Sequence, residues 1–166
     1  MSQIDAALEE NPGDKILGIL CNWCSYGGAD TAGVSRMQYP TNVRIARVMC
    51  TGRVDKKFID HAFEKGAGMV MIGGCHINDC HYISGNVHME KREKMIRRNM
   101  EQKGIDPDRF LLTWISASEG QKFQETIKER TDKLKELGPR DLKKEKAVAE
   151  KVAAEAAKKA AEAKKE

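Results

Sequence analysis

The sequence predicts a small α/β protein in which strands and helices alternate as β-α-β-α-β-α-β-α around a four-stranded parallel sheet. Four short, nearly continuous apolar segments have strand length, which is typical of strands that helices cover on both faces. Segments with one apolar face lie between them and predict the helices. The length of 166 residues suits one domain with appendages. The predicted strands are residues 15–20, 43–49, 68–72 and 110–115.

A predicted helix follows each of the first two strands. Residues 29–37 form a short helix that ends before Pro40, because the residue preceding a proline avoids the helical conformation. Residues 54–65 place apolar side chains on one face. Asp55 suits the beginning of this helix and Gly66 suits its end.

Two longer predicted helices complete the pattern. Residues 87–103 are followed by Gly104, which favours a helix end. The last helix begins near Ser118, which forms a capping-box pattern with Gln121, and it stops at the Gly-Pro pair of residues 138–139. Because strands and helices alternate, we expect right-handed crossovers and parallel strands.

The second strand is expected nearer an edge of the sheet than the others. Arg44 and Arg47 interrupt its apolar run, so its side chains alternate between polar and apolar. Such alternation is typical of a strand with one solvated face.

Both ends of the chain are predicted to lie outside the α/β domain, which we place at residues 15–140. Residues 1–14 contain four acidic side chains and no basic one, so they form an acidic N-terminal extension. Residues 141–166 are rich in alanine, lysine and glutamate and contain few larger apolar side chains. We therefore expect a charged tail that is helical or disordered.

Charge and hydropathy exclude several classes of protein. Lysine plus arginine is 29 and aspartate plus glutamate is 25, so the net charge is 29 − 25 = +4. No run approaches the roughly 20 apolar residues of a membrane span, and the acidic start lacks the features of a signal peptide. We therefore expect a cytoplasmic, soluble protein with no membrane partner.

A basic segment at residues 91–103 raises the question of nucleic-acid binding. Acidic residues interrupt the segment, and no nucleic-acid-binding signature accompanies it, so we expect no nucleic-acid partner. A solvated helix face, or a docking surface for an acidic protein around Arg92, Arg97 and Arg98, is the favoured interpretation.

Five cysteines follow the first three predicted strands, and no cysteine lies in a predicted helix. Because the carboxyl ends of parallel strands lie at the same edge of a sheet, these thiols are expected to converge there. Five is an odd number, so a complete disulfide framework would leave one thiol over. The cysteines are Cys21 and Cys24 after the first strand, Cys50 after the second, and Cys75 and Cys80 after the third.

Four interpretations of these cysteines stay open on the residues alone. They can be small buried hydrophobic residues, or Cys21 and Cys24 can form a redox pair that leaves the other three unexplained. They can hold a structural zinc ion, although only one C-x-x-C is present. They can also hold an iron–sulfur cluster, which takes four thiolates. Glycines beside the cysteines favour the cluster, because their backbone N–H groups can bond sulfur, but spacing does not separate a two-iron from a four-iron cluster.

The remaining polar residues suggest no catalytic centre. His76 and His81 each follow a cysteine, and we expect them around the site or at the surface rather than as ligands. The sequence contains no dinucleotide-binding or phosphate-binding glycine motif and no paired acid–base system. We therefore interpret the chain as an electron carrier that is not an enzyme on its own.

Four ordered strings resemble the delta subunit of the methyl-viologen-reducing hydrogenase of methanogenic archaea, which is the small iron–sulfur component of a NiFe hydrogenase. The resemblance covers about residues 15–140 and excludes the tail. The strings are CNWCSY at 21–26, RVMCTGRV at 47–54, GGCHINDCHY at 73–82 and WISASEG at 114–120.

This resemblance implies one 2Fe-2S cluster held by four of the five cysteines. Cys21, Cys24, Cys50 and Cys75 rank ahead of Cys80, because each lies closer to a strand end. The resemblance also implies electron relay from NiFe hydrogenase subunits, or from formate dehydrogenase, to the flavin subunit of heterodisulfide reductase in methanogenesis. A structural zinc-binding interaction module of a larger complex is the alternative.

Overall fold

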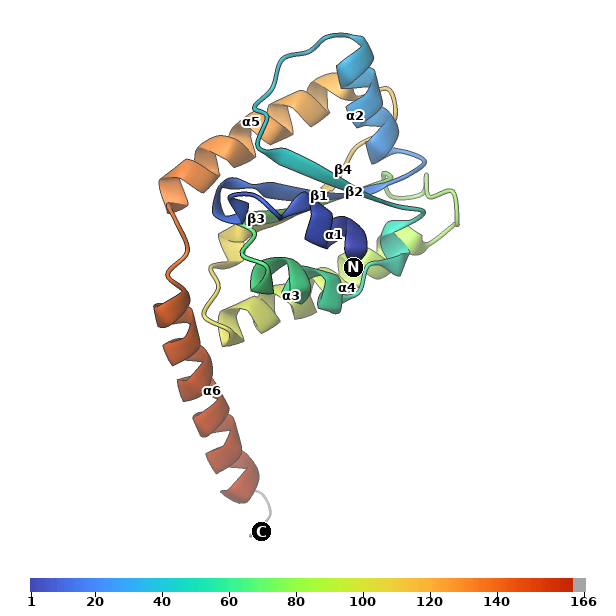
Figure 1. Ribbon diagram of the computed structural model, residues 1–166. Helices are drawn as coiled ribbons and strands as arrows, with labels where there is room; N and C mark the ends of the chain where they lie inside the picture. The colour runs from blue at the N-terminus through green and yellow to red at the C-terminus, as the bar shows by residue number, and fades with distance from the viewer. Residues whose placement is uncertain (163–166) are drawn as a thin grey trace.

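Four parallel strands form one sheet in the order β2-β1-β3-β4 (Figure 1). The computed structural model describes residues 1–162. The predicted fold class is confirmed, and every predicted strand lies within two residues of its expected position. The strands are β1 (Ile16–Cys21), β2 (Val43–Val48), β3 (Met69–Gly74) and β4 (Phe110–Trp114).

The second strand lies at an edge of the sheet, as its charged residues predict. β2 pairs with β1 alone, and Arg44 and Arg47 are exposed. β1 and β3 are the two central strands, and every residue of each is buried. A central strand must satisfy hydrogen bonds on both sides and pack on both faces, which explains its uninterrupted apolar run.

Helices cover both faces of the sheet. α2 and α5 lie on one face, and α1, α3 and α4 lie on the other (Figure 1). The bounds are α1 (Ser2–Ala7), α2 (Ser25–Val34), α3 (Lys56–Glu64), α4 (Gly85–Gln102) and α5 (Gly120–Leu137). The described residues also form three short 3-10 helices: η1 (Pro12–Asp14), η2 (Thr51–Arg53) and η3 (Pro107–Arg109).

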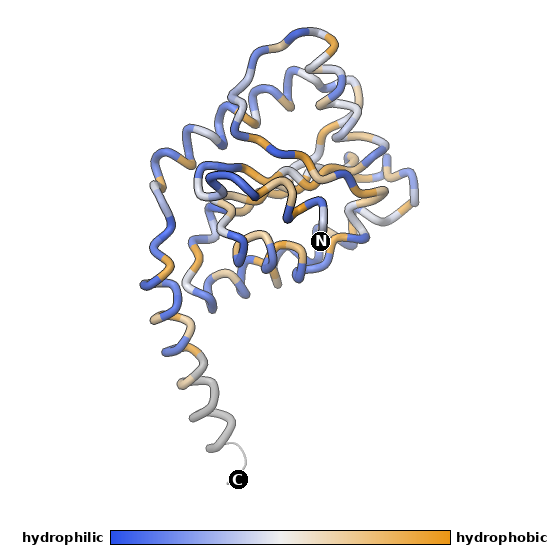
Figure 2. Tube along the Cα trace, viewed as in Figure 1, coloured by the Kyte–Doolittle hydropathy of each residue, from blue (hydrophilic) through white to orange (hydrophobic). Residues whose placement is uncertain are grey.

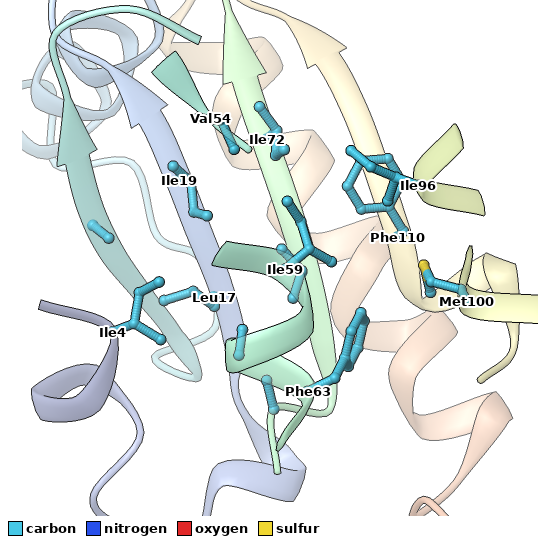
Figure 3. Close-up of a cluster of buried hydrophobic side chains, with 14 of the residues drawn as sticks. Ile4, Leu17, Ile19, Val54, Ile59, Phe63, Ile72, Ile96, Met100 and Phe110 are labelled. Atoms are coloured by element: carbon cyan, nitrogen blue, oxygen red, sulfur yellow. The ribbon is translucent and has the colours of Figure 1, made fainter. Parts of the chain in front are cut away.

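The alternation of side chains along the strands divides the core into two clusters. Leu17 and Ile19 of β1 belong to the cluster on the side of α3 and α4, where they join Ile59 (Figure 3). Ile16 and Leu20 of the same strand pack beneath α2 and α5. Figure 2 shows hydrophobic residues gathered along the strands. Burial of these alternating side chains is the main stabilising contribution to the sheet.

The acidic N-terminal segment contributes to the first core cluster. Ile4 and Leu8 are buried against it, with exposed fractions of 3% and 4%. Asp5 accepts a hydrogen bond from His61 of α3 at 2.7 Å, and this bond is the main reason that the pKa of Asp5 lies below its usual value. The domain boundary at residue 15 stays a prediction, and α1 packs against the domain.

Helix ends follow the sequence signals at Asp55, Gly66, Gly104 and Gly138. They depart from them at Ser118 and in α2, which covers Ser25–Val34 instead of residues 29–37. Asp55 caps α3 by accepting from the Lys57 N–H at 2.9 Å. Gly66 and Gly104 adopt positive φ angles of 91° and 70° after α3 and α4, as helix-ending glycines do. The capping box at Ser118 is wrong, because α5 begins at Gly120 and the Ser118 hydroxyl bonds Ser116 instead.

The C-terminal tail forms helix α6 (Leu142–Glu162), which projects from the domain (Figure 1). Arg140 ties its first turn to the domain. Its guanidinium donates two hydrogen bonds to Glu145 at 3.0 and 2.6 Å and one to the Phe63 carbonyl at 2.6 Å. Residues 163–166, part of the predicted tail, lie outside the described residues. Across residues 1–162, helices with the length and hydropathy for crossing a membrane are absent.

We expect Arg140→Ala to lower the free energy of unfolding by about 2–4 kcal/mol, because Glu145 and a backbone carbonyl lose a buried cationic partner. Anaerobic chemical denaturation followed by circular dichroism measures this change. Lys143→Ala, at an exposed position of α6, is the control and should stay within about 0.5 kcal/mol of the wild type. Equal stability of the two variants would contradict the role assigned to Arg140.

Candidate metal centre

The cysteines gather where the chain leaves the two central strands in opposite directions. After β1 the chain continues into α2 on one face, and after β3 it continues into α4 on the other (Figure 1). In open parallel sheets, this switch point leaves a crevice at the carboxyl ends of the strands, where ligands bind. All five cysteines are free thiols, and their mutual interactions show that the structure brings the five together.

One pair of thiols spans the switch point. The sulfur atoms of Cys21 and Cys75 lie 3.6 Å apart, and each residue is only 1% exposed. Cys24 also contacts the Cys75 thiol. Burial raises the pKa of Cys21 to about 11 and the pKa of Cys75 to about 12. Both thiols would have to release their protons to serve as thiolate ligands of a metal ion.

A second pair joins the loop after β2 to the loop after β3. The sulfur atoms of Cys50 and Cys80 lie 3.9 Å apart. Burial acts to raise the pKa of Cys80, but hydrogen bonds from the backbone N–H groups of Asn86, Tyr82 and Gly85 bring that pKa below its ordinary value. These groups lie around the beginning of α4, where the helix also favours negative charge.

The sulfur-to-sulfur distances fit pairs of thiolates on tetrahedral metal ions. A metal–sulfur bond of about 2.3 Å in tetrahedral geometry separates two sulfurs by about 3.8 Å. The observed separations are 3.6 and 3.9 Å. Within residues 1–162, groups of three or more His, Cys, Asp or Glu side chains arranged to hold one metal ion are absent. The donor set consists of two thiol pairs with Cys24 beside Cys75, and soft thiolates suit zinc or iron–sulfur centres.

Ser25 links the ends of the two central strands. Its hydroxyl accepts a hydrogen bond from the Cys21 N–H at 2.9 Å and donates one to the Gly73 carbonyl at 2.6 Å. A side chain at position 73 would collide with Ser25, since its Cβ would lie 2.8 Å from the Ser25 Cβ. The glycine at the end of β3 therefore lets Ser25 fix the backbone on both sides of the first thiol pair.

The beginning of α4 holds the second thiol pair and the Cys75 loop together. The Asn86 side chain is fully buried, and its amide donates to the Cys75 carbonyl at 3.1 Å and to the His76 carbonyl at 2.6 Å. Gly85 lies against both sulfurs of the second pair, because a Cβ there would collide with Cys50 Sγ and lie 3.3 Å from Cys80 Sγ. Two adjacent residues of one helix thus position three cysteines.

Arg92, further along α4, fixes the loop that follows Cys50. Its guanidinium donates to the Gly52 carbonyl at 2.6 Å and to the Val54 carbonyl at 2.9 Å. Arg97 also bonds within the domain, to a glutamate of the same helix and to a backbone carbonyl of η3. Two of the three arginines that the sequence assigns to a docking surface therefore support the fold.

The imidazole rings of the two histidines near the cysteines contact residues other than the thiols, while the backbone N–H of His81 bonds the Cys75 thiol. His76 Nε2 lies 2.6 Å from a Glu119 carboxylate oxygen, which also accepts from the Ser116 N–H at 2.7 Å. The Ser116 N–H and then His76 hold the pKa of Glu119 at about 2. His81 stacks on Trp23 with ring centroids 3.9 Å apart. Both arrangements are consistent with the expected roles around the site.

Sequence patterns identified the cysteines but not the residues that position them. The signal for Asn86 was its place three residues before Met89, which puts both on the buried face of α4. A buried asparagine must find hydrogen-bond partners, and only the fold shows that these are the carbonyls beside Cys75. The sequence placed Arg92 on a docking surface and gave no role to Ser25, because Gly73 O and the carbonyls of Gly52 and Val54 come from distant segments.

The fold and the site define a class of protein: a small α/β protein with paired thiols at the switch point of a parallel sheet, suited to a thiolate-bound metal centre. Residues 16–138 match the family described as methyl-viologen-reducing hydrogenase, delta subunit. The chain belongs to this family.

Relatives of two kinds match the chain, and those of the first kind are proteins of similar length. The chain is 52% identical over 136 residues to the vhc iron–sulfur subunit of the F420-non-reducing hydrogenase of Methanococcus voltae, covering 82% of this chain and 94% of that protein. It is 46% identical over 125 residues to the iron–sulfur subunit of the F420-non-reducing hydrogenase of Archaeoglobus profundus, covering 75% and 91%.

The second group consists of longer proteins, which we call the long reductase subunits. The chain is 45% identical over 124 residues to one of the subunits of the ferredoxin/F(420)H(2)-dependent CoB-CoM heterodisulfide reductase of Methanosarcina acetivorans. The match covers 75% of this chain but only 16% of that protein. A sequence like this one therefore occurs as one part of a much larger polypeptide.

We expect Gly85→Ala to prevent stable metal binding, because its methyl group would occupy the space of Cys50 Sγ. Iron analysis of the anaerobically purified variant, with far-ultraviolet circular dichroism to verify the fold, measures the effect. Gly33→Ala is the matched control, since a Cβ at position 33 of α2 has no atom within 4 Å. Normal iron content in Gly85→Ala would contradict the close packing of the second thiol pair.

We expect Asn86→Asp to lower metal affinity roughly tenfold. The substitution preserves shape but replaces the two donated hydrogen bonds with repulsion between a carboxylate and two carbonyls. Competition with a chelator, read as the rate of iron loss, measures the change. Gln102→Glu makes the same chemical exchange at an exposed position of α4 and should lose iron at the wild-type rate. Equal rates of iron loss in the two variants would reject the role of Asn86.

Proposed function

We propose that the chain binds one 2Fe-2S cluster and relays electrons from a hydrogenase, or from a formate dehydrogenase, to the flavin subunit of heterodisulfide reductase in methanogenesis. The observation that carries the proposal is the arrangement of thiols in two pairs, 3.6 and 3.9 Å apart. A 2Fe-2S cluster needs two thiolates on each of two iron ions, whereas one zinc ion needs four sulfurs around a single centre.

We assign the four ligands from the two pairs of sulfur atoms that lie 3.6 and 3.9 Å apart. Cys21 and Cys75 form one pair, Cys50 and Cys80 form the other, and Cys24 remains in reserve beside Cys75. The sequence ranking that places Cys80 last stays a prediction, and the sulfur-to-sulfur distances support the set that includes Cys80.

The surroundings of the thiols suit an electron carrier. Bound by the thiolates, a 2Fe-2S cluster supplies one-electron reduction and oxidation. The residues of the chain shield the site and direct N–H groups at sulfur: Gly52 donates to Cys50 Sγ at 3.4 Å, and the beginning of α4 donates to Cys80. Hydrogen bonds to sulfur and exclusion of water both tune the reduction potential of such clusters.

The names of the relatives support the proposed partners. The relatives of similar length are hydrogenase iron–sulfur subunits, and the longer relatives belong to heterodisulfide reductases. An electron carrier that joins these two enzymes accounts for both groups of relatives.

The five thiols, none of them in a disulfide, agree with a reducing, cytoplasmic location.

We expect the protein purified without oxygen to contain about two iron and two acid-labile sulfide per chain, and to give an electron paramagnetic resonance signal after reduction. Metal analysis and spectroscopy of the same sample test this. One zinc ion per chain in a colourless protein would contradict the proposal and support the structural zinc alternative.

Single Cys→Ser variants test the ligand set separately. We expect the variants at positions 21, 50, 75 and 80 to lose iron or to show an altered signal, because serine replaces a thiolate ligand. Cys24→Ser should keep full iron content and an unchanged signal. Loss of the cluster in Cys24→Ser with its retention in Cys80→Ser would reject the pairing and restore the sequence ranking.

A further inference from the structure

Exposed apolar side chains surround the cysteines on the outer surface of the molecule. Five of the large hydrophobic residues that the described part of the chain exposes lie in the loops after β1, β2 and β3, next to the thiols. We call this set the apolar rim: Trp23, Met49, Ile77, Tyr82 and Ile83, which are 45%, 58%, 38%, 49% and 87% exposed. Large exposed apolar side chains gathered on the loops at one edge of a sheet are typical of a protein–protein contact.

Aromatic contacts hold part of the apolar rim in a fixed arrangement. The Trp23 indole stacks on His81, and its N–H donates to the Tyr82 hydroxyl at 3.3 Å. The His81 and Tyr82 rings meet edge to face, with centroids 4.9 Å apart. A rigid cluster containing tryptophan and tyrosine loses little side-chain entropy on binding, and these residue types dominate the energetic centres of interfaces.

Ile83 has an exposed side chain on a strained backbone. Its φ angle is 70°, a conformation that a β-branched residue rarely adopts, and its side chain is the most exposed of the apolar rim. Backbone strain that the fold maintains without burying the side chain points to a role in binding. The loop holds Ile83 in place through a hydrogen bond from its N–H to the Cys80 carbonyl at 2.8 Å.

The basic face of α4 is a weaker candidate for the same contact. Arg92 and Arg97 donate their hydrogen bonds within the domain, so their guanidinium groups are not available as a paired charged surface. The residues of the apolar rim also belong to the cysteine-bearing loops, whereas the arginines of the basic face lie further along α4. Electron transfer favours the surface with the shortest path to the metal centre.

We propose that the apolar rim is the docking surface for the long reductase subunit, with Ile83 inserted into an apolar pocket of that partner. This inference rests on the proposed function. The occupant is chosen because a sequence 45% identical to this domain forms 16% of such a subunit in Methanosarcina acetivorans. In that polypeptide the domain is covalently joined to its partner, so a surface that fits the remainder of the long reductase subunit is expected on the separate chain.

The test measures binding of the purified, iron-loaded chain to the heterodisulfide reductase subunit of the same organism that corresponds to the remainder of the long reductase subunit. We expect Ile83→Asp to raise Kd at least tenfold, because a carboxylate must then enter an apolar pocket. Val34→Asp is the matched control: Val34 is 78% exposed on α2, outside the cysteine-bearing loops, and its substitution should leave Kd within about twofold. Both variants should keep the wild-type iron content and resonance signal.

Ile83→Gly keeps the experiment informative if Ile83→Asp folds poorly. Glycine accepts a φ of 70° without strain, so this variant should be at least as stable as the wild type while still binding more weakly. Contact through the apolar rim also predicts little salt dependence of Kd, whereas contact through the basic helix predicts a steep one.

Several outcomes would overturn the docking proposal. The first is an unchanged Kd in both Ile83 variants. The second is a rise in Kd for Val34→Asp as large as the rise for Ile83→Asp. The third is that the Ile83 variants lose binding to the hydrogenase while their binding to the reductase subunit stays intact. Each of these outcomes is measured on iron-loaded protein, so it contradicts the docking proposal without contradicting the proposed function. An iron-free wild-type chain would instead reject the proposed function itself.

Discussion

The divergence of the chain after β1 and β3 is the constraint on which the sulfur site depends. Because the two central strands send their following helices to opposite faces, their carboxyl ends are left uncovered and close together. Cys21 and Cys75 meet across this opening, and the buried hydroxyl of Ser25 links the two strand ends beside them. The sheet thereby supplies a rigid base for thiols that are 54 residues apart in sequence.

Helix α4 adds a second support from outside the sheet. Its beginning directs N–H groups at Cys80, its Asn86 side chain holds the Cys75 loop, and its Arg92 holds the loop after Cys50. Each contact joins a group of the helix to a loop that the sheet alone does not position. The same helix that covers one face of the core therefore sets the positions of three sulfur atoms, which couples packing to metal binding.

Local patterns predicted much of this fold, while long-range contacts escaped them. Continuous apolar runs located the strands, and the two arginines of β2 placed that strand at an edge, because each signal depends on neighbouring residues. The pairing of thiols depends on strand order, the role of Asn86 depends on distant carbonyls, and the burial of Ile4 depends on how α1 docks. The expected capping box at Ser118 failed because its hydroxyl bonds the Ser116 hydroxyl and α5 begins only at Gly120.

Mössbauer spectroscopy of protein enriched with ⁵⁷Fe tests most directly whether the two thiol pairs hold a binuclear centre. We predict two iron subsites of equal intensity, both ferric before reduction, with one becoming ferrous when a single electron is added. A spectrum of four coupled irons, a single mononuclear iron, or absence of iron from the anaerobically prepared chain would contradict that assignment.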